Sequence, residues 1–159
     1  MADGNSVVAR TKILQAAAQQ LGLPVTISEQ YPKGLGHTVP ELASNEAKVF
    51  EKLSFSCWRD DAMRGHLTEL HETGRPQVMV AGIEAHVCVL QTAVDLAQAG
   101  FATYVVEDAV SSRQKQSLDL ALARMSAVGV QVINTEMAVF ELLGKAGSPA
   151  FKALSALIR

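Results

Sequence analysis

Apolar runs and helically spaced apolar positions alternate along the chain. Short runs with the length and β-branched content of strands lie at 25–29, 77–81, 101–106 and 130–134, and a further extended segment covers 48–55. Apolar residues at helical spacing predict helices at 6–21, 60–73, 85–99, 114–128, 136–143 and 149–158. A loop rich in turn-forming residues covers 30–36. This alternation is typical of βα units around a parallel sheet.

The strand and helix ends sharpen this prediction. Gly22, Gly74, Gly100 and Gly129 stand where helices need a C-terminal cap. The apolar runs at 78–81 and 104–106 lack alternation, which is typical of strands buried on both faces. We therefore expect a three-layer α/β/α fold with a central parallel sheet of Rossmann type, in one domain over residues 1–159.

Composition and charge restrict the classes of molecule that this chain is expected to bind. The 159 residues are 48% hydrophobic and 19% charged, which suits one domain with a substantial core. A net charge of −2 and the absence of a Lys/Arg run argue against nucleic acid and anionic membranes as partners. We expect a small-molecule substrate or another protein.

Cysteine content and the N-terminal residues suggest a compartment. The two cysteines lack CxxC spacing, so they indicate reduced thiols rather than a disulfide framework. No apolar run approaches the length of a membrane span, and residues 1–5 lack the basic start and apolar segment of a signal peptide. These features favour a cytoplasmic protein.

Cys88 is the candidate nucleophile. It lies just inside the predicted helix 85–99, after a strand that ends near Gly82. The first turn of a helix offers unpaired N–H groups and a positive dipole, which favour a thiolate and can hold an oxyanion. Taken alone, a cysteine on an alanine-rich helix is more often a buried apolar residue. We interpret Cys57, which has no such setting, as structural.

The carboxyl ends of the other strands contribute the remaining candidates, because active sites of open parallel sheets lie there. Lys52 ends the extended segment at 48–55. The candidates near it and near Cys88 are Glu29, Tyr31, Phe55, Glu84, Ala85, His86, Val87, Asp108, Ser111, Ser112 and Arg113. Tyr31 stands in a loop that borders the substrate or is a plain turn. We expect Asp108 and its neighbouring serines to cap the helix that starts near Gln114.

Four segments together resemble the isochorismatase-like cysteine hydrolases, a family that includes nicotinamidases. The segments are 28–36, 51–56, 81–92 and 106–113, in the family's order, and the resemblance covers essentially the whole chain. It is strongest to the subgroup called isochorismatase domain-containing proteins. The resemblance implies hydrolysis of an amide, ester or vinyl-ether bond of a small molecule, and a sheet with strand order 3-2-1-4-5-6.

The resemblance also implies residue roles. Cys88 matches the family nucleophile, and Lys52 matches the lysine that would lower the thiol pKa. A non-proline cis peptide would fall at about Ile83–Glu84. Backbone N–H groups near Glu84, Ala85, His86, Val87 and Cys88 would hold the oxyanion.

One departure from the family is clear. The family begins with an apolar strand ending in Asp-x-Gln, which supplies the catalytic base and the central strand. We expect the domain to be N-terminally short, with a gap between the strands at 25–29 and 77–81; truncation is favoured over closure of the gap by its neighbours. Glu29 or Glu84 could replace the missing carboxylate, which geometry must decide.

Other chemistries find little support. His86 and Cys88 alone do not make a metal site, and His37 lacks the ligand pattern that nicotinamidases carry nearby. Gly34 and Gly36 do not form a phosphate loop, and no GxSxG motif is present. We expect no metal and no cofactor.

Two functional classes remain. The first is a cysteine hydrolase with Cys88 and Lys52 in its site. The second is a catalytically silent or truncated family member that oligomerises or binds other proteins. Homo-oligomerisation is expected in either case, and the aliphatic segment 151–158 packs against another subunit or within its own chain.

Overall fold

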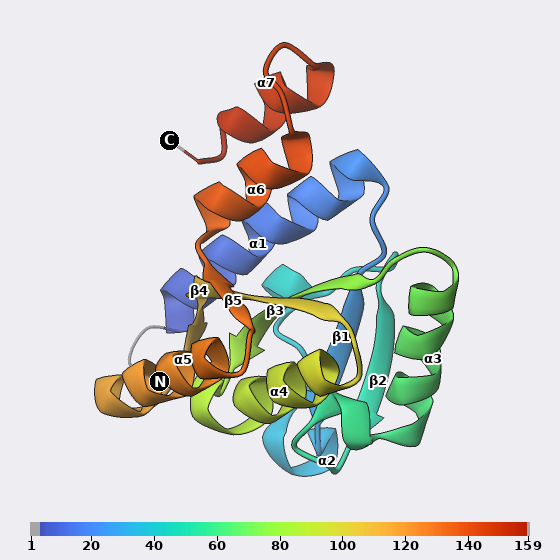
Figure 1. The fold of residues 1–159 in the computed structure, drawn as a ribbon, viewed down its shortest axis with the longest axis vertical. Helices are drawn as coiled ribbons and strands as arrows, with labels where there is room; N and C mark the ends of the chain where they lie inside the picture. The colour runs from blue at the N-terminus through green and yellow to red at the C-terminus, as the bar shows by residue number, and fades with distance from the viewer. Residues whose placement is uncertain (1–3, 159) are drawn as a thin grey trace.

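Two parallel sheets form the centre of the fold (Figure 1). The structure is a computed structural model that describes residues 4–158. The strands are β1 (Thr26–Gln30), β2 (Lys48–Lys52), β3 (Gln77–Ile83), β4 (Ala102–Ser111) and β5 (Gln131–Ile133). Strand β1 pairs with β2, and β4 lies between β3 and β5, with every pair parallel. The expected α/β fold is therefore confirmed.

Helices flank the strands and account for most of the remaining chain. They are α1 (Gly4–Leu21), α2 (Pro32–Leu35), α3 (Asp61–Glu72), α4 (Leu90–Gln98), α5 (Lys115–Ala127), α6 (Thr135–Leu143) and α7 (Pro149–Ser155). Short turns of other helical types are η1 (Pro40–Leu42), η2 (Cys57–Arg59) and the π-helical turn η3 (Ala85–Val89). No helix in residues 4–158 is long and apolar enough to cross a membrane.

Strand β4 carries the core on both of its faces. Val105 packs with α4 and α5, whereas its neighbour Val106 packs with Leu14 of α1 and Ala138 of α6. Successive strand residues point to opposite faces, so a strand with helices on both sides needs apolar residues at both. Figure 1 shows α1 and α6 together on one side of β4 and α4 with α5 on the other. This confirms the expected three layers.

The sequence predicted each of these strands and most helix positions, and the differences are local. Residues 85–99 form η3 followed by α4 rather than one α-helix, and β4 continues to Ser111, beyond the predicted end at Val106. Part of the predicted loop 30–36 is the short helix α2. Residues 1–3, at the end where no signal peptide was recognised, lie outside the described residues.

The edges of β1 and β3 that face away from β2 and β4 have no strand partner within residues 4–158. This matches the gap expected from the sequence, and the neighbouring strands have not closed it. Met79 and Ile83 of β3 are 37% and 53% exposed. The two sheets are held together through helices instead, because Leu67 of α3 packs with Leu96 of α4 and with Phe101.

The C-terminal segment packs within its own chain. Leu154 is buried against Ala17 of α1 and Val139 of α6, and Ile158 joins this cluster. The ring of Phe151 lies 6.1 Å from that of Phe140, measured between centroids. Of the two alternatives for this segment, the structure supports intramolecular packing; among the large apolar side chains of 151–158, only Leu157 is exposed.

Candidate active site

The candidate residues converge at the carboxyl ends of β1, β2 and β3. Gln30 ends β1 and pairs in register with Lys52, which ends β2. Cys88 lies in η3, five residues after the end of β3 at Ile83. Parallel strands bring their carboxyl ends to one edge of a sheet, so residues far apart in sequence meet there. The prediction that Lys52 and Cys88 share one site agrees with this placement.

Lys52 is buried and fully hydrogen bonded. The residue is only 3% exposed. Its ammonium donates to Gln30 Oε1 at 2.6 Å, to Ser54 O at 3.0 Å and to Phe55 O at 2.9 Å. An ammonium has three N–H donors, and here each has one neutral oxygen acceptor. Lys52 therefore carries a buried positive charge with no carboxylate hydrogen bonded to it in the described part of the chain.

The Cys88 sulfur contacts the same glutamine. Its Sγ lies 4.0 Å from Gln30 Oε1, and in this contact the thiol is the donor and the amide oxygen the acceptor. Burial raises the pKa of the Cys88 thiol, and this outweighs the lowering by the positive charge of Lys52. Cys57 and the Glu84 carboxylate raise it further, whereas a backbone hydrogen bond at Glu84 lowers it. The net shift is therefore upward, opposite to the net lowering expected, although the effect of Lys52 itself has the expected direction.

The segment before Cys88 has the expected backbone. The peptide bond between Ile83 and Glu84 is cis. The turn η3 then begins at Ala85, which is fully buried. The N–H of Val87 donates to Glu84 O at 3.1 Å, so it is engaged within the turn and is removed from the candidate oxyanion donors. The N–H groups of Ala85, His86 and Cys88 remain candidates.

The carboxylates of the two glutamates expected to replace the catalytic aspartate have hydrogen-bond partners other than Cys88. Glu29 accepts from Thr38 N at 2.8 Å and lies 2.7 Å from His37 Nδ1. The Thr38 backbone hydrogen bond, followed by the His37 hydrogen bond, lowers the pKa of Glu29 from its ordinary 4.5 to about 2. Glu84 accepts from Arg113 Nε at 2.9 Å. Both carboxylates therefore have other partners.

His86 and the two aromatic candidates lie around this centre. His86 Nδ1 lies 2.9 Å from Oγ of the buried Ser112. Tyr31 has a left-handed backbone with φ of 42° and is half exposed. Phe55 exposes 54% of its surface, and its carbonyl oxygen accepts from Lys52. The backbone of Phe55 thus belongs to the site, while its ring is open to solvent.

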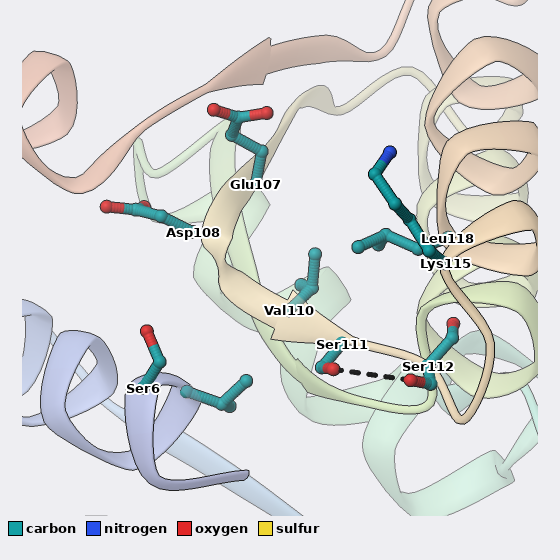
Figure 2. A pocket seen from close by; sticks show the side chains of 9 residues that line it. Ser6, Glu107, Asp108, Val110, Ser111, Ser112, Lys115 and Leu118 are labelled. Carbon is teal, nitrogen blue, oxygen red and sulfur yellow. Dashed lines mark hydrogen bonds between the residues drawn. The ribbon is translucent and has the colours of Figure 1, made fainter. Parts of the chain in front are cut away.

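Two cavities lie farther along the strand ends. One of about 270 Å³ is lined by His86, Arg113, Gln114 and Ser117. The other, of about 400 Å³, lies between the start of α1 and the start of α5, and Figure 2 shows Ser6, Asp108 and Lys115 around it. Neither is lined by Cys88 or Lys52.

Asp108 does not cap the helix that was expected. Its Oδ1 accepts from the backbone N and from Oγ1 of Thr135, both at 2.8 Å, at the start of α6. Its Oδ2 lies 3.4 Å from Nε of Arg10. The extension of β4 beyond Val106 turns Asp108 toward α1 and α6, whereas α5 begins after Gln114 with no side-chain cap.

Glu29, His37 and Glu51 place one potential ligand atom each within 4.8 Å of one another. Two of the three are already joined by the hydrogen bond between Glu29 and His37, and His37 and Glu51 are exposed. Carboxylates at a surface commonly approach each other in this way without an ion. We assign no metal site to this group.

Sequence reasoning missed Gln30. It is the residue that contacts both Lys52 and Cys88, 22 and 58 positions away. Its position beside a predicted strand end was a signal. A glutamine side chain is neutral and does not ionise, however, so Gln30 was not among the candidate catalytic residues.

The isochorismatase domain profile matches residues 1–137. The secreted isochorismatase effector Isc1 of Phytophthora sojae is 40% identical over 162 residues, covering 97% of this chain and 75% of that protein. Isochorismatase domain-containing protein 2 of Pongo abelii is also 40% identical, over 97% of this chain and 72% of its own.

Solved structures are also similar to this chain. One described as MAR1 ribonuclease from Caenorhabditis elegans has a TM-score of 0.86 and 38% identity, covering 96% of this chain and 78% of that one. Another, described as YcaC from Pseudomonas aeruginosa with hexane-2,5-diol and covalent acrylamide, has a TM-score of 0.81 and 26% identity, covering 96% and 75%.

Proposed function

Because the chain belongs to the isochorismatase family, we propose that it is a cysteine hydrolase that cleaves an amide, ester or vinyl-ether bond of a small molecule. The observation that carries the proposal is the meeting of Cys88, Lys52 and Gln30 at the carboxyl ends of the strands. We further propose that residues 1–159 form a single domain of this kind and that the protein works in the cytoplasm.

The proposed reaction on an amide proceeds in two steps. The Cys88 sulfur attacks the carbonyl carbon, an S–C bond forms, and the resulting oxyanion accepts hydrogen bonds from backbone N–H groups of η3. The C–N bond then breaks, and the amine leaves with the proton that the thiol has lost. Water attacks the thioester, the C–S bond breaks, and the acid and the free thiol are released.

Lys52 supports this reaction through its charge. Since its three N–H groups are already hydrogen bonded, the ammonium stabilises the thiolate by field rather than by direct donation. The likeness to a solved structure described with covalent acrylamide supports the proposal of a reactive nucleophile in this chain. Acrylamide is therefore a suitable probe for Cys88.

A silent family member is the second candidate. It is supported by the raised pKa of the Cys88 thiol and by the engagement of Glu29 and Glu84 elsewhere. In that case the fold serves binding or assembly. The RNA suggested by the name of one solved relative would need a positive surface, which the net charge of −2 does not favour.

We also propose a homo-oligomer. Leu35 and Leu53, in the segments that follow β1 and β2, expose 73% and 75% of their surfaces, and Phe55 is close by in sequence. Exposed apolar side chains that cluster on a surface mark interfaces. Light scattering on the purified chain tests this assembly.

The deciding experiment compares Cys88→Ala with Cys57→Ala. Acrylamide is first offered to the native chain at neutral pH, and labelling of Cys88 and Cys57 is compared by mass spectrometry of the separated peptides. Because burial raises the pKa of the Cys88 thiol, faster labelling of Cys88 than of Cys57 would mean that the site activates it in spite of burial. A panel of small amides, esters, vinyl ethers and an RNA oligonucleotide is then offered to both variants. Hydrolysis that Cys57→Ala retains and Cys88→Ala loses supports the proposal. Equal labelling of the two cysteines together with no hydrolysis favours the silent member.

A further inference from the structure

Gln30 occupies a position between the two charged or ionisable groups of the site. Its Oε1 accepts from Lys52 Nζ at 2.6 Å and faces Cys88 Sγ at 4.0 Å. Its Nε2 donates to Leu53 O at 2.8 Å. A flipped amide would turn its N–H groups toward the Lys52 donors and its oxygen toward a carbonyl oxygen. The network therefore fixes the oxygen of Gln30 on the side of Lys52 and Cys88.

This orientation has opposite effects on the two forms of Cys88. An amide oxygen accepts a hydrogen bond from the neutral thiol but offers nothing except repulsion to a thiolate. It also takes the N–H of Lys52 that would otherwise be available to a thiolate, since Ser54 O and Phe55 O hold the other two. Both effects favour the thiol.

We propose that Gln30 is a positioning residue that holds the Lys52 ammonium away from the Cys88 sulfur and keeps the resting nucleophile protonated. This role rests on the proposed function, for which it sets the protonation state of the nucleophile. The other groups that act on Cys88 are Cys57 of η2 and Glu84, which precedes η3 and is paired with Arg113. Neither of these is hydrogen bonded to Gln30 in the described part of the chain.

The test is the pH dependence of Cys88 alkylation by iodoacetamide in Gln30→Met. In this reaction an S–C bond forms, the C–I bond breaks, iodide leaves and the thiol proton passes to water. Methionine keeps the volume but removes the acceptor, so we expect the midpoint of the rate profile to fall by about one pH unit. Gln30→Glu places a carboxylate beside the sulfur and neutralises Lys52, and its midpoint should rise.

Lys52→Met and the double variant show whether Gln30 acts through Lys52. Lys52→Met alone should raise the midpoint, and adding Gln30→Met to it should then lower the midpoint by much less than in the parent chain. Thr26→Ala is the matched control, because it alters the same face of β1 four residues earlier, where the Thr26 hydroxyl lies 3.1 Å from His66 Nε2 and not beside either cysteine. It should leave the Cys88 midpoint unchanged.

Each outcome separates this proposal from the proposed function. A midpoint that stays fixed or rises in Gln30→Met, in a variant whose thermal unfolding matches the parent, overturns the role of Gln30 even where Cys88→Ala abolishes hydrolysis. The expected shifts without any hydrolysis support the role of Gln30 and leave the hydrolase proposal rejected. If Gln30→Met does not fold, the direction of the Gln30→Glu shift decides, and a fall there contradicts the proposal.

Discussion

Strands β1 and β2 each carry a buried charged side chain, and the two charges have different kinds of hydrogen-bond partner. Lys52 is satisfied by neutral oxygens, whereas the nearby carboxylate of Glu29 is satisfied by a backbone N–H and by His37. A buried charge costs free energy unless it is hydrogen bonded, so both residues depend on their partners. The difference matters for pH, because only the Glu29 contact has an ionisable partner.

Glu29 should make folding stability depend on acid pH. Its pKa falls from 4.5 to about 2 in the folded chain, through the Thr38 N–H and then His37. The contribution is therefore present above pH 4.5 and is lost as the pH falls through about 2. We expect Glu29→Gln to melt at a lower temperature than the parent at neutral pH, and the difference to shrink across that window.

Glu51→Gln is the control for this melting experiment. Glu51 pairs in register with Glu29 but is exposed, so its loss should change the melting temperature little at any pH. A difference between parent and Glu29→Gln that stays constant down to pH 2 would contradict the assignment. Glu29 raises the pKa of His37 in the folded chain. The contribution of protonated His37 to folding stability is therefore complete below the ordinary pKa of histidine and is lost only as the pH rises above it.

At single residues, the sequence indicated the features that a motif names and missed those that depend on contacts in the fold. The family pattern placed Cys88 and Lys52 in one site, where the structure brings both into contact with Gln30, and the cis bond before Glu84 was placed correctly. Lys52 lowers the thiol pKa as expected, but burial raises it by more, and burial cannot be read from residue order. Gln30 was missed because glutamine carries no charge and its two contacts exist only in the folded chain.

Among the elements, α4 and α3 join the two sheets. Leu96 is 1% exposed and packs with Leu67 and Phe101, with Trp58 against the same cluster. A second link is the hydrogen bond from Cys57 N to Thr92 Oγ1 at 2.9 Å, and a third is the ion pair of Arg59 with Asp95. Side-chain packing thus replaces a strand ladder between β1 and β3.

Leu96→Ala should weaken this connection strongly. Removal of a buried leucine side chain typically lowers the free energy of unfolding by about 2–5 kcal/mol. Leu120→Ala, at a position of α5 that is 63% exposed, is the matched control and should change it by less than about 0.5 kcal/mol. Urea unfolding followed by circular dichroism measures both variants, and equal midpoints would contradict the packing argument.

Asp108 links β4 to α6, and this too can be tested. Asp108→Ala removes the hydrogen bonds to Thr135 N and Oγ1, and loss of such a cap costs about 0.5–2 kcal/mol. Hydrogen exchange should accelerate in the first turn of α6 and stay unchanged in α5. Gln114→Ala is the control at α5, where no side-chain cap exists. Faster exchange in α5 of Asp108→Ala would instead support the expectation from the sequence that Asp108 caps α5.

Element positions were predictable because their signals are local. Apolar spacing and terminal glycines fixed the helices to within a few residues, and Gly100 and Gly129 do adopt positive φ. The end of β4 was not predictable, since Glu107 and Asp108 interrupt the apolar run and the strand continues only because β3 pairs with it as far as Ser111. The π-helical form of η3 likewise has no local signal.

On the scale of the whole molecule, the two sheets should differ in stability. Strand β4 has a partner on both sides and helices on both faces, whereas β1 and β2 form a two-stranded sheet. Local opening requires less free energy where fewer contacts are lost. We therefore expect amide hydrogens at 103–106 to exchange most slowly and those of β1 and β2 faster, by mass spectrometry. Uniform protection of both sheets would contradict this view.

The open edges of β1 and β3 also bear on how the protein behaves in a concentrated solution. An unpaired strand presents a row of N–H and C=O groups that a strand of another molecule can extend. Met79 and Ile83 add exposed apolar surface beside one of these rows. We expect warming at high concentration to produce β-rich precipitates that bind amyloid dyes, and charged substitutions at Met79 and Ile83 to delay their onset. For storage and crystallisation, these two positions matter more than the small net charge.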